Sequence, residues 1–451
     1  MRVLAVSVAP LFPGVVMGGS QRILTEVVDA LGAAGHEVRV LCSQNGSDET
    51  FTTPGGVVVE PSIPLRGSFP APYQVTPHRL SAAWHVLSEA ANWADRAYLH
   101  ADAIYMRQAL GDLPVIRSLH DFVYEEALIS AFALSAERTI VPSQYIADCI
   151  AASAGVVTAT GELTVIPNGI QVPVGRVAPV LPNDVAPRRN QDLLLLHPHR
   201  LHAEKGIEES MQVAVEVQRR VPGRNVRLLA PAPDRGGALD EASVAEQAVT
   251  RIARSVGAED LLEFHRWLGA DEMPGYYAAG DVTLCPGRFV EAFGLVPLES
   301  AVVGTPAVCA RVGALREKVG VPGVSLFDYG DIATAATAVV EAVIERFDVN
   351  ETAREIRKRY SLDSMRSAYV EAITGELPGN RAGAVVDGDK WRLAPWCYVS
   401  ADRVFHDYFG RYERFPTLIS ALSIDSRVVD TTGINPDELA RARRDGFIVP
   451  G

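Results

Sequence analysis

The chain has 451 residues, which is too long for one ordinary hydrophobic core and predicts two domains. Hydrophobic residues make up 48% and charged residues 22%, a balance typical of globular rather than disordered proteins. The net charge of −13 argues against nucleic acid as a partner, because binding a phosphate backbone requires basic surface. Residues 1–190 contain no polybasic cluster, so association with an anionic membrane is not expected.

The cysteines and the first residues of the chain both bear on the cellular compartment of the protein. The cysteines form no close pair and no metal-ligand spacing, which predicts free, mostly buried thiols in a reducing environment. Residues 1–8 are a short apolar run that meets Pro10 and Pro13, which predicts a first β-strand rather than a signal peptide. We therefore expect a cytoplasmic protein. The cysteines are Cys42, Cys149, Cys285, Cys309 and Cys397.

The chain opens with a strand, a glycine-rich loop and a helix. Residues 2–8 form the predicted strand and residues 10–19 the loop. Ser20 is the predicted helix cap, because apolar residues recur after it at helical spacing up to Leu31. A return strand over 37–41 completes a βαβ unit, which predicts a parallel, doubly wound sheet. Further elements are predicted as a helix over 81–97 and strands over 103–106, 114–118 and 138–142.

A second α/β pattern follows residues 172–190, which are rich in Pro and Val and predict an interdomain linker. The predicted fold class is α/β with two doubly wound Rossmann-like domains, an N-terminal domain over 1–175 and a C-terminal domain over 190–351. Two helical pieces are predicted within 352–373. The elements predicted for the second domain are a helix over 208–220 and strands over 193–197, 226–230, 262–265, 282–286 and 307–310.

Residues 377–451 form a C-terminal extension outside this pattern. Asn435 is the cap of a predicted helix that has proline at its first position and runs to Arg444. Gly446 ends the helix, and a short strand is predicted over 447–450. The order fits a small winged-helix-like unit and equally a simple brace. The extension could recognise a protein carrier, cover the site or form a homodimer.

Two carboxylates eight positions apart mark the most informative stretch. Glu291 follows the predicted strand over 282–286, and Glu299 lies about two turns into a helix predicted over 295–303. A helix start binds phosphate through its N–H groups, and carboxylates beside it accept hydrogen bonds from sugar and ribose hydroxyls. Anion and polyol together predict a nucleotide-sugar ligand. The structural alternative is an ordinary turn with surface acids.

A second stretch places two cations at the carboxyl end of a predicted strand, where doubly wound folds bind ligands. Arg200 and Lys205 follow the strand over 193–197, and Lys205 is one of only four lysines. When a nucleoside diphosphate departs, negative charge builds on the leaving oxygen, and two fixed cations stabilise it. The alternative is a surface loop with scattered charges.

The spacing of the two carboxylates resembles the E-x7-E motif of the retaining glycosyltransferases of family 4, which have the GT-B fold. The resemblance covers about residues 1–375 and implies two Rossmann-like domains facing across a cleft. It also implies a crossover helix near 352–375 and a nucleoside-diphosphate sugar as donor. The matching positions, in the family's order, are Pro167–Asn168–Gly169, Arg200, Lys205, Glu291 and Glu299.

The resemblance implies roles for individual residues. Gly18 and Gly19 would let backbone N–H groups approach the donor phosphate or the acceptor, although a glycine pair is otherwise a plain turn. His120 would face the sugar, unless Asp121 simply caps a helix beside it. The residues with implied catalytic roles are His120, Glu291, Arg200 and Lys205. The residues with implied donor-binding roles are Gly18, Gly19, Arg200, Lys205, Trp267, Leu268, Phe293, Gly294, Leu295 and Glu299.

The implied reaction needs no metal ion and no cofactor. The diphosphate leaves, an oxocarbenium-like species forms, and the acceptor attacks the same face; double displacement through Glu291 is the alternative. Asp387–Asp389 has the D-x-D form of metal-dependent glycosyltransferases, but its place in the extension predicts a solvated turn. The predicted acceptor of what resembles an actinobacterial enzyme is a soluble small molecule, such as a natural-product scaffold or a thiol-sugar precursor. Lipid and polysaccharide acceptors are the alternatives.

Four other functions compete with glycosyl transfer. A nucleotide-sugar epimerase or a sugar phosphorylase could use the same fold, and an idle nucleotide-sugar-binding subunit could keep the same ligand. A dinucleotide oxidoreductase is disfavoured because no G-x-G-x-x-G follows the first strand.

Overall fold

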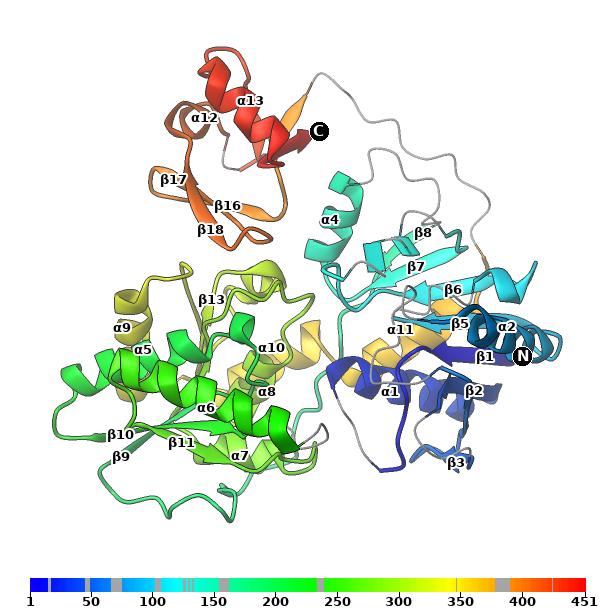
Figure 1. Cartoon of the computed structure of the whole chain (residues 1–451), viewed down its shortest axis with the longest axis horizontal. Helices are drawn as coiled ribbons and strands as arrows, with labels where there is room; N and C mark the ends of the chain where they lie inside the picture. Colours follow the sequence, from blue (N-terminus) through cyan, green and yellow to red (C-terminus); the bar gives the residue numbers. More distant parts are fainter. Residues whose placement is uncertain are drawn as a thin grey trace. The chain divides into compact units, whose positions relative to one another are not determined.

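The chain divides into two compact units, shown in the computed structural model of Figure 1. Unit 1 comprises Met1–Gly169 and Asp363–Gly451, and unit 2 comprises Ile170–Leu362, so the chain passes between them twice. The residues that the structure describes are 1–14, 18–44, 49–65, 75–101, 107–124, 127–128, 130–131, 134–153, 162–232, 239–345, 347–377, 390–423 and 425–451.

Unit 1 is built around an eight-stranded sheet with the order β3-β4-β2-β1-β5-β6-β7-β8. Neighbouring strands run parallel, except that the short β3 is antiparallel to β4. The strands are β1 Arg2–Ser7, β2 Glu37–Ser43, β3 Phe51–Thr52, β4 Val58–Ile63, β5 Arg96–His100, β6 Val115–Ser118, β7 Arg138–Val141 and β8 Glu162–Val165. The helices are α1 Gly19–Ala33, α2 Pro77–Ala91, the 3-10 turn η3 Gln108–Leu110, α4 Gln144–Ser153 and α11 Leu362–Thr374.

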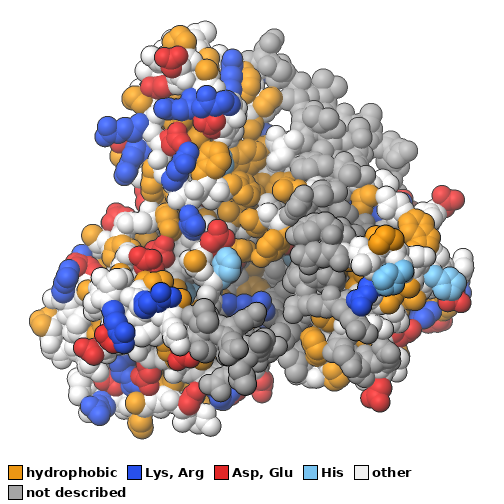
Figure 2. All heavy atoms as spheres, in the orientation of Figure 1, with side chains coloured by type: hydrophobic (Ala, Val, Ile, Leu, Met, Phe, Trp, Pro, Cys, Tyr) orange, Lys and Arg blue, Asp and Glu red, His pale blue; other side chains and the backbone are white. Residues whose placement is uncertain are grey.

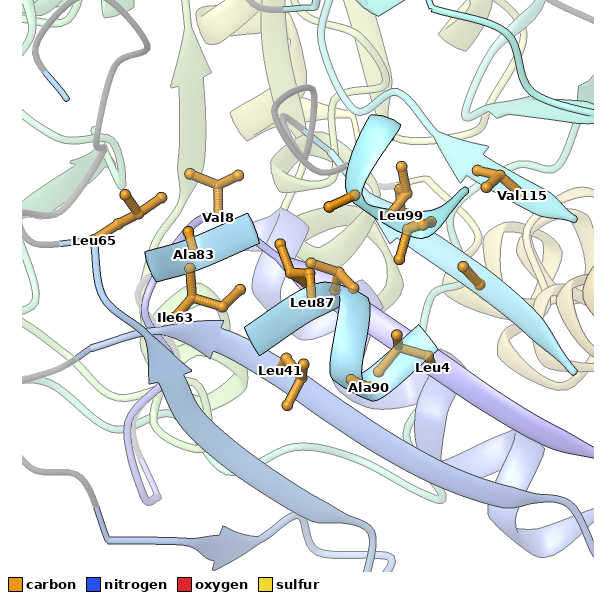
Figure 3. Packing of buried hydrophobic residues seen from close by; sticks show 14 of the residues in the cluster. Leu4, Val8, Leu41, Ile63, Leu65, Ala83, Leu87, Ala90, Leu99 and Val115 are labelled. Atoms are coloured by element: carbon orange, nitrogen blue, oxygen red, sulfur yellow. The ribbon is translucent and has the colours of Figure 1, made fainter. Parts of the chain in front are cut away.

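One hydrophobic core of this sheet forms where strand side chains meet the helix α2 (Figure 3). Leu4 of β1, Leu41 of β2 and Leu99 of β5 pack with Leu87 of α2, and all four side chains are buried. Full burial of one such side chain contributes roughly 1.5–3 kcal/mol. This packing fixes the central strands, whose carboxyl ends carry the polar residues considered below.

Unit 2 holds a six-stranded, all-parallel sheet with the order β11-β10-β9-β12-β13-β14. The chain order reverses at β9, which has β10 on one side and β12 on the other. The strands are β9 Asp192–Leu196, β10 Asn225–Pro231, β11 Leu262–His265, β12 Val282–Cys285, β13 Ala307–Ala310 and β14 Val324–Phe327. The helices are η4 Ala203–Lys205, α5 Ile207–Arg220, α6 Leu239–Val256, α7 Met273–Ala279, α8 Val296–Val302, η5 Gly313–Lys318, α9 Ile332–Ile344 and α10 Val349–Arg359.

The two parallel sheets confirm the predicted fold class, with corrections in the N-terminal half. The helix predicted over 81–97 ends at Ala91, and Arg96–His100 is instead the central strand β5. Ser20 is not the cap: α1 begins at Gly19, and the Ser20 hydroxyl is bonded to His100. The strand predicted over 103–106 lies in a part of the chain outside the described residues. The strands β3, β4 and β8 were not predicted.

The extension forms two small antiparallel sheets, β19-β15-β20 and β16-β17-β18. The predicted helix is confirmed as α13, because the Asn435 side chain accepts hydrogen bonds from the N–H groups of Asp437 and Glu438. A winged-helix-like unit stays a prediction. The elements are β15 Trp391–Leu393, β16 Cys397–Ser400, β17 Arg403–His406, β18 Arg411–Arg414, α12 Pro416–Ser420, β19 Val428–Val429, α13 Pro436–Arg444 and β20 Ile448–Pro450.

Surface and bulk properties agree with the composition. Acidic and basic side chains are interspersed on the face of the molecule drawn in Figure 2. Among the described residues, no helix is long and apolar enough to cross a membrane. All five cysteines fall in described ranges, and they are buried thiols with no disulfide bond.

Candidate active site

In unit 2 the two informative stretches leave the same edge of the sheet. β9 leads into the segment with Arg200 and Lys205, and β12 leads into the segment with Glu291. The two strands are parallel neighbours, with Leu195 opposite Val282 and Leu196 opposite Thr283. Their carboxyl ends therefore lie side by side where the strand order reverses, the usual ligand site of an open α/β sheet.

Two glycines let these segments touch backbone to backbone. Gly206 ends η4 in the left-handed region with φ +84°, and a Cβ there would lie 2.5 Å from the Gly287 nitrogen. A Cβ on Gly287 would in turn overlap the carbonyl groups of Glu204 and Lys205. The Phe289 N–H donates to the Glu204 carbonyl at 2.8 Å. Any side chain at either glycine would push the segments apart.

This contact brings two of the predicted residues together. Nζ of Lys205 lies 2.6 Å from Oε1 of Glu291, and each side chain is 23% exposed. The same ammonium lies 3.6 Å from the centroid of the Phe289 ring, so a cation–π contact also holds it. The partly exposed pair leaves both groups accessible to a ligand while fixing their orientation.

The Glu291 backbone is held by a third loop, which was not predicted. Gly313 at the start of η5 has φ +57°, and a Cβ there would lie 2.6 Å from the Glu291 carbonyl oxygen. The Ala314 N–H donates to that oxygen at 2.8 Å. Glu291, on the segment after β12, is therefore held by the segment that follows β9 and by the loop that follows β13.

Trp267, one of the implied donor-binding residues, lies beside Arg200. The Arg200 guanidinium carbon is 6.0 Å from the centroid of the Trp267 ring, and Trp267 is 42% exposed. Leu268 is buried in the core with Tyr276 and Tyr277, so its side chain is structural. The Trp267 ring is the exposed apolar surface that this stretch offers.

The second carboxylate lies nearer the helix start than predicted. α8 begins at Val296, so Glu299 is in its first turn, and its N–H donates to the Leu295 carbonyl at 3.0 Å. The buried Tyr277 donates its hydroxyl to Oε2 of Glu299 at 3.4 Å. Gly294 before the helix adopts φ +81°, and the Phe293 side chain is buried. The turn between Glu291 and Glu299 is therefore compact and rigid.

His197 and His199, which were not predicted as site residues, lie beside the cations. Burial and the Lys205 charge lower the pKa of His199 to about 3, and the pKa of His197 well below its ordinary value. His197 is hydrogen-bonded through Nδ1 to the Ser210 hydroxyl at 2.9 Å. Both rings are neutral at neutral pH, so they add nothing to the positive charge that Arg200 and Lys205 carry at this sheet edge.

Unit 1 gathers a separate polar network at the carboxyl ends of β1, β5 and β6. The Tyr98 hydroxyl is bonded to His100 Nδ1 and to the Ser118 hydroxyl, both at 2.9 Å. His100 Nε2 lies 2.9 Å from the Ser20 hydroxyl, and His120 Nε2 lies 3.0 Å from the Ser118 hydroxyl. The network therefore links the start of α1 to the predicted catalytic histidine.

Gly18 is the N-cap of α1 and Gly19 is its first residue, so the glycine pair lies at the helix start rather than wholly in the predicted loop. The centroids of the His100 and His120 rings are 4.4 Å apart. Burial lowers the pKa of His120 to about 4. His120 is therefore neutral at neutral pH. The helix predicted over 81–97 hides His100 from the sequence, although a histidine that closes the apolar run Ala97–Tyr98–Leu99 is a usable signal.

Among the described residues, no group of three or more His, Cys, Asp or Glu side chains could hold a metal ion. The D-x-D residues 387–389 fall outside the described part of the chain, so their predicted turn stays a prediction.

Family models and similar sequences agree on the class of enzyme. Residues 17–172 match the model of Glycosyltransferase Family 4, and residues 193–345 match that of Glycosyl transferases group 1. A glycogen synthase from Mycobacterium tuberculosis is 27% identical over 398 residues, which cover 80% of this chain and 91% of the relative. A D-inositol 3-phosphate glycosyltransferase from Catenulispora acidiphila is 29% identical over 193 residues, which cover 42% of this chain and 44% of that one.

Solved structures share the fold. Sucrose-phosphate synthase from Thermosynechococcus elongatus has a TM-score of 0.64 at 16% identity and covers 81% of this chain and 96% of its own. HepE from Anabaena in complex with UDP-glucose has a TM-score of 0.60 at 19% identity and covers 82% of this chain and 98% of its own. Together with the two family models, these likenesses identify the chain as a glycosyltransferase of the GT-B fold.

Proposed function

We propose that this glycosyltransferase moves a sugar from a nucleoside-diphosphate donor to a hydroxyl-bearing acceptor, with retention at the anomeric carbon and without a metal ion. The observation that carries the proposal is the Lys205–Glu291 pair, with 2.6 Å between its charged atoms at the reversal point of the unit 2 sheet. A cation and a carboxylate fixed together there match the two halves of a nucleotide-sugar: the diphosphate and the hydroxyl-bearing sugar.

Each residue of the pair has a separate task. Lys205 has three N–H donors, so its ammonium can bind a phosphate oxygen while it still contacts Glu291. Arg200, on the same segment, adds a second cation for the diphosphate. Glu291 accepts hydrogen bonds from sugar hydroxyls, and Glu299 at the start of α8 accepts them from the ribose. The Trp267 ring offers an apolar surface to the base.

The reaction follows from these tasks. The bond between the anomeric carbon and the diphosphate oxygen breaks, and Arg200 and Lys205 stabilise the charge that grows on that oxygen. The acceptor oxygen attacks the oxocarbenium-like carbon on the same face, and its proton passes to the departing phosphate. His120 is neutral, so it positions the sugar by hydrogen bonding rather than by charge.

Calorimetry with UDP, GDP, dTDP and ADP tests the donor site. UDP is the first probe, because the similar HepE structure contains UDP-glucose. We expect one diphosphate to bind the wild type selectively and to lose at least tenfold in affinity in Lys205→Ala, since a charge-assisted contact contributes about 1.5–3 kcal/mol. Lys358→Ala is the matched control, because Lys358 is exposed on α10 of the same unit.

Equal diphosphate affinities of the wild type and Lys205→Ala would refute the assignment of Lys205 to the donor site. Proton NMR of the transfer product then tests retention, because an α-linked donor must give an α-linked product. The same assay with EDTA tests metal independence, for which we expect an unchanged rate.

A further inference from the structure

The extension presents one rigid hairpin tip between β17 and β18. The Gly410 N–H donates to the His406 carbonyl at 2.8 Å, and the Asp407 N–H donates to the Trp396 carbonyl at 2.9 Å. The Phe409 ring stacks on His406 with 4.1 Å between centroids. Backbone and ring contacts therefore fix the direction in which Asp407 and Tyr408 leave the hairpin.

These two residues contact the glycosyltransferase domain of unit 1. Asp407 is 2% exposed, and its Oδ2 accepts a hydrogen bond from the Tyr145 hydroxyl of α4 at 2.8 Å. The Tyr408 hydroxyl donates to the backbone carbonyl of Phe122 at 3.0 Å. Ala152 of α4 also packs on the hydrophobic core of the extension, so the two parts share one interface.

The Phe122 carbonyl belongs to the turn that follows His120. Oδ1 of Asp121 accepts hydrogen bonds from the N–H groups of Val123 and Tyr124, both at 3.4 Å, which closes the turn locally. Phe122 itself is only 2% exposed. The hydrogen bond from Tyr408 therefore holds the backbone two residues after His120. Over so short a segment, a shift of the Phe122 carbonyl would also shift His120.

We propose that Tyr408 is a positioning residue of the enzyme, through which the extension holds the 120–124 turn, and with it His120, in the orientation that transfer requires. The inference rests on the role that the proposed function gives to His120. A brace could rely on apolar contacts alone. The buried carboxylate and the tyrosine hydroxyl are instead polar groups that cost free energy unless both partners stay in place.

Two matched variants in one hairpin test this role. Tyr408→Phe removes only the hydroxyl that reaches Phe122. Tyr412→Phe is the control, because the Tyr412 hydroxyl bonds to Tyr398 at 2.9 Å inside the extension. Both are assayed for hydrolysis of the glucose conjugate of whichever diphosphate binds in calorimetry, with water as acceptor, from pH 4 to 8.

For Tyr408→Phe we expect kcat to fall about five- to tenfold, which corresponds to the loss of one hydrogen bond. We also expect the acid limb of the pH profile to move up towards 6.5, because water then reaches His120. Diphosphate affinity should stay unchanged, since unit 2 supplies that site. Tyr412→Phe should match the wild type in all three respects.

Equal kcat values and equal acid limbs in the two variants would overturn the inference. That failure differs from failure of the proposed function, which would show as diphosphate binding that ignores Lys205. If Tyr408→Phe does not fold, Asp407→Asn gives the second test, because it keeps the shape of the side chain and weakens the bond from Tyr145. Asp407→Asn should also lower kcat. An Asp407→Asn variant whose kcat and acid limb equal those of the wild type would overturn the inference as well.

Discussion

The Lys318 ammonium lies 3.6 Å from the centroid of the Phe293 ring, inside the turn that joins Glu291 to Glu299. It is also 4.5 Å from the Tyr360 ring, it is fully buried, and no hydrogen-bond partner for it exists among the described residues. Two aromatic faces thus take the place of water around a cation. Phe293 and Tyr360 share a hydrophobic core with Ile170. The cation therefore packs against the turn between Glu291 and Glu299, close in sequence and in space to the residues where unit 2 begins and ends.

The buried lysine makes stability depend on pH in a definite direction. Burial lowers the pKa of Lys318 to about 7, with Glu317 raising it and Arg359 lowering it. Between about pH 7 and the ordinary lysine value of about 10.4, the unfolded chain holds more protons than the folded one. The free energy of unfolding therefore rises with pH across that window, by up to about 1.4 kcal/mol per unit.

Lys318→Met should remove this dependence, because methionine fills a similar volume without charge. Denaturant unfolding should show the variant gaining most on the wild type at pH 6 and losing that advantage towards pH 10. Lys358→Met, on an exposed position, should follow the wild type at every pH. Parallel curves for Lys318→Met and the wild type would contradict the prediction.

The glycine contact between the two donor-site segments should tolerate no side chain. Gly287→Ala places a methyl group against the Glu204 and Lys205 carbonyl groups, so we expect a loss of roughly 2–4 kcal/mol in unfolding free energy. Diphosphate binding should weaken with it, because the Lys205–Glu291 pair depends on that contact. Gly223→Ala is the control, since nothing lies within 4 Å of the methyl group that it adds. Equal stability and affinity in both variants would show that the segments can separate freely.

Much of unit 2 was predictable because its signals are local. Each buried strand is a short apolar run, and Lys205 and Glu291 each follow such a run. In a parallel sheet that alone puts both residues at the same edge. Their direct contact was not predictable, because β9 and β12 are neighbours in the sheet although the strands β10 and β11, the helices α5, α6 and α7 and the 3-10 turn η4 separate them in the chain.

The unpredicted parts depend on contacts between distant segments. The predicted helix over 81–97 runs into the first two residues of β5, because the alanine-rich sequence continues to Ala97, and only the central place of Arg96–His100 in the sheet identifies the strand. For the same reason His100 is not predicted as a site residue, although the ring of the predicted His120 packs against it. Lys318 shows no local pattern, since its aromatic partners lie 25 and 42 positions away (318 − 293 and 360 − 318). The contact of Tyr408 with Phe122 likewise spans 286 positions.

Glu291→Gln should separate the two halves of donor recognition. Removing the carboxylate relieves Lys205 of its 2.6 Å partner, so the diphosphate alone should bind up to about fivefold tighter, which corresponds to roughly 1 kcal/mol. The sugar loses its charged acceptor, so kcat should fall at least about a hundredfold. Calorimetry with UDP and with UDP-glucose measures the two effects side by side. Glu204→Gln, a 42% exposed neighbour, is the control, and weaker diphosphate binding in Glu291→Gln would contradict the assignment.

The neutral His120 should leave a signature in both rate and stability. Because burial lowers its pKa to about 4, the rate should show no titration near 6.5 and should fall only at acid pH. Between about pH 4 and 6.5 the unfolded chain binds more protons at this position, so the free energy of unfolding rises with pH there. His120→Gln should make that rise shallower, because the other buried histidines, such as His197 and His199, still contribute to it, whereas His78→Gln, on the exposed start of α2, should leave the rise unchanged. A rate profile with a midpoint near 6.5 that disappears in His120→Gln would show instead that the histidine acts by changing its charge.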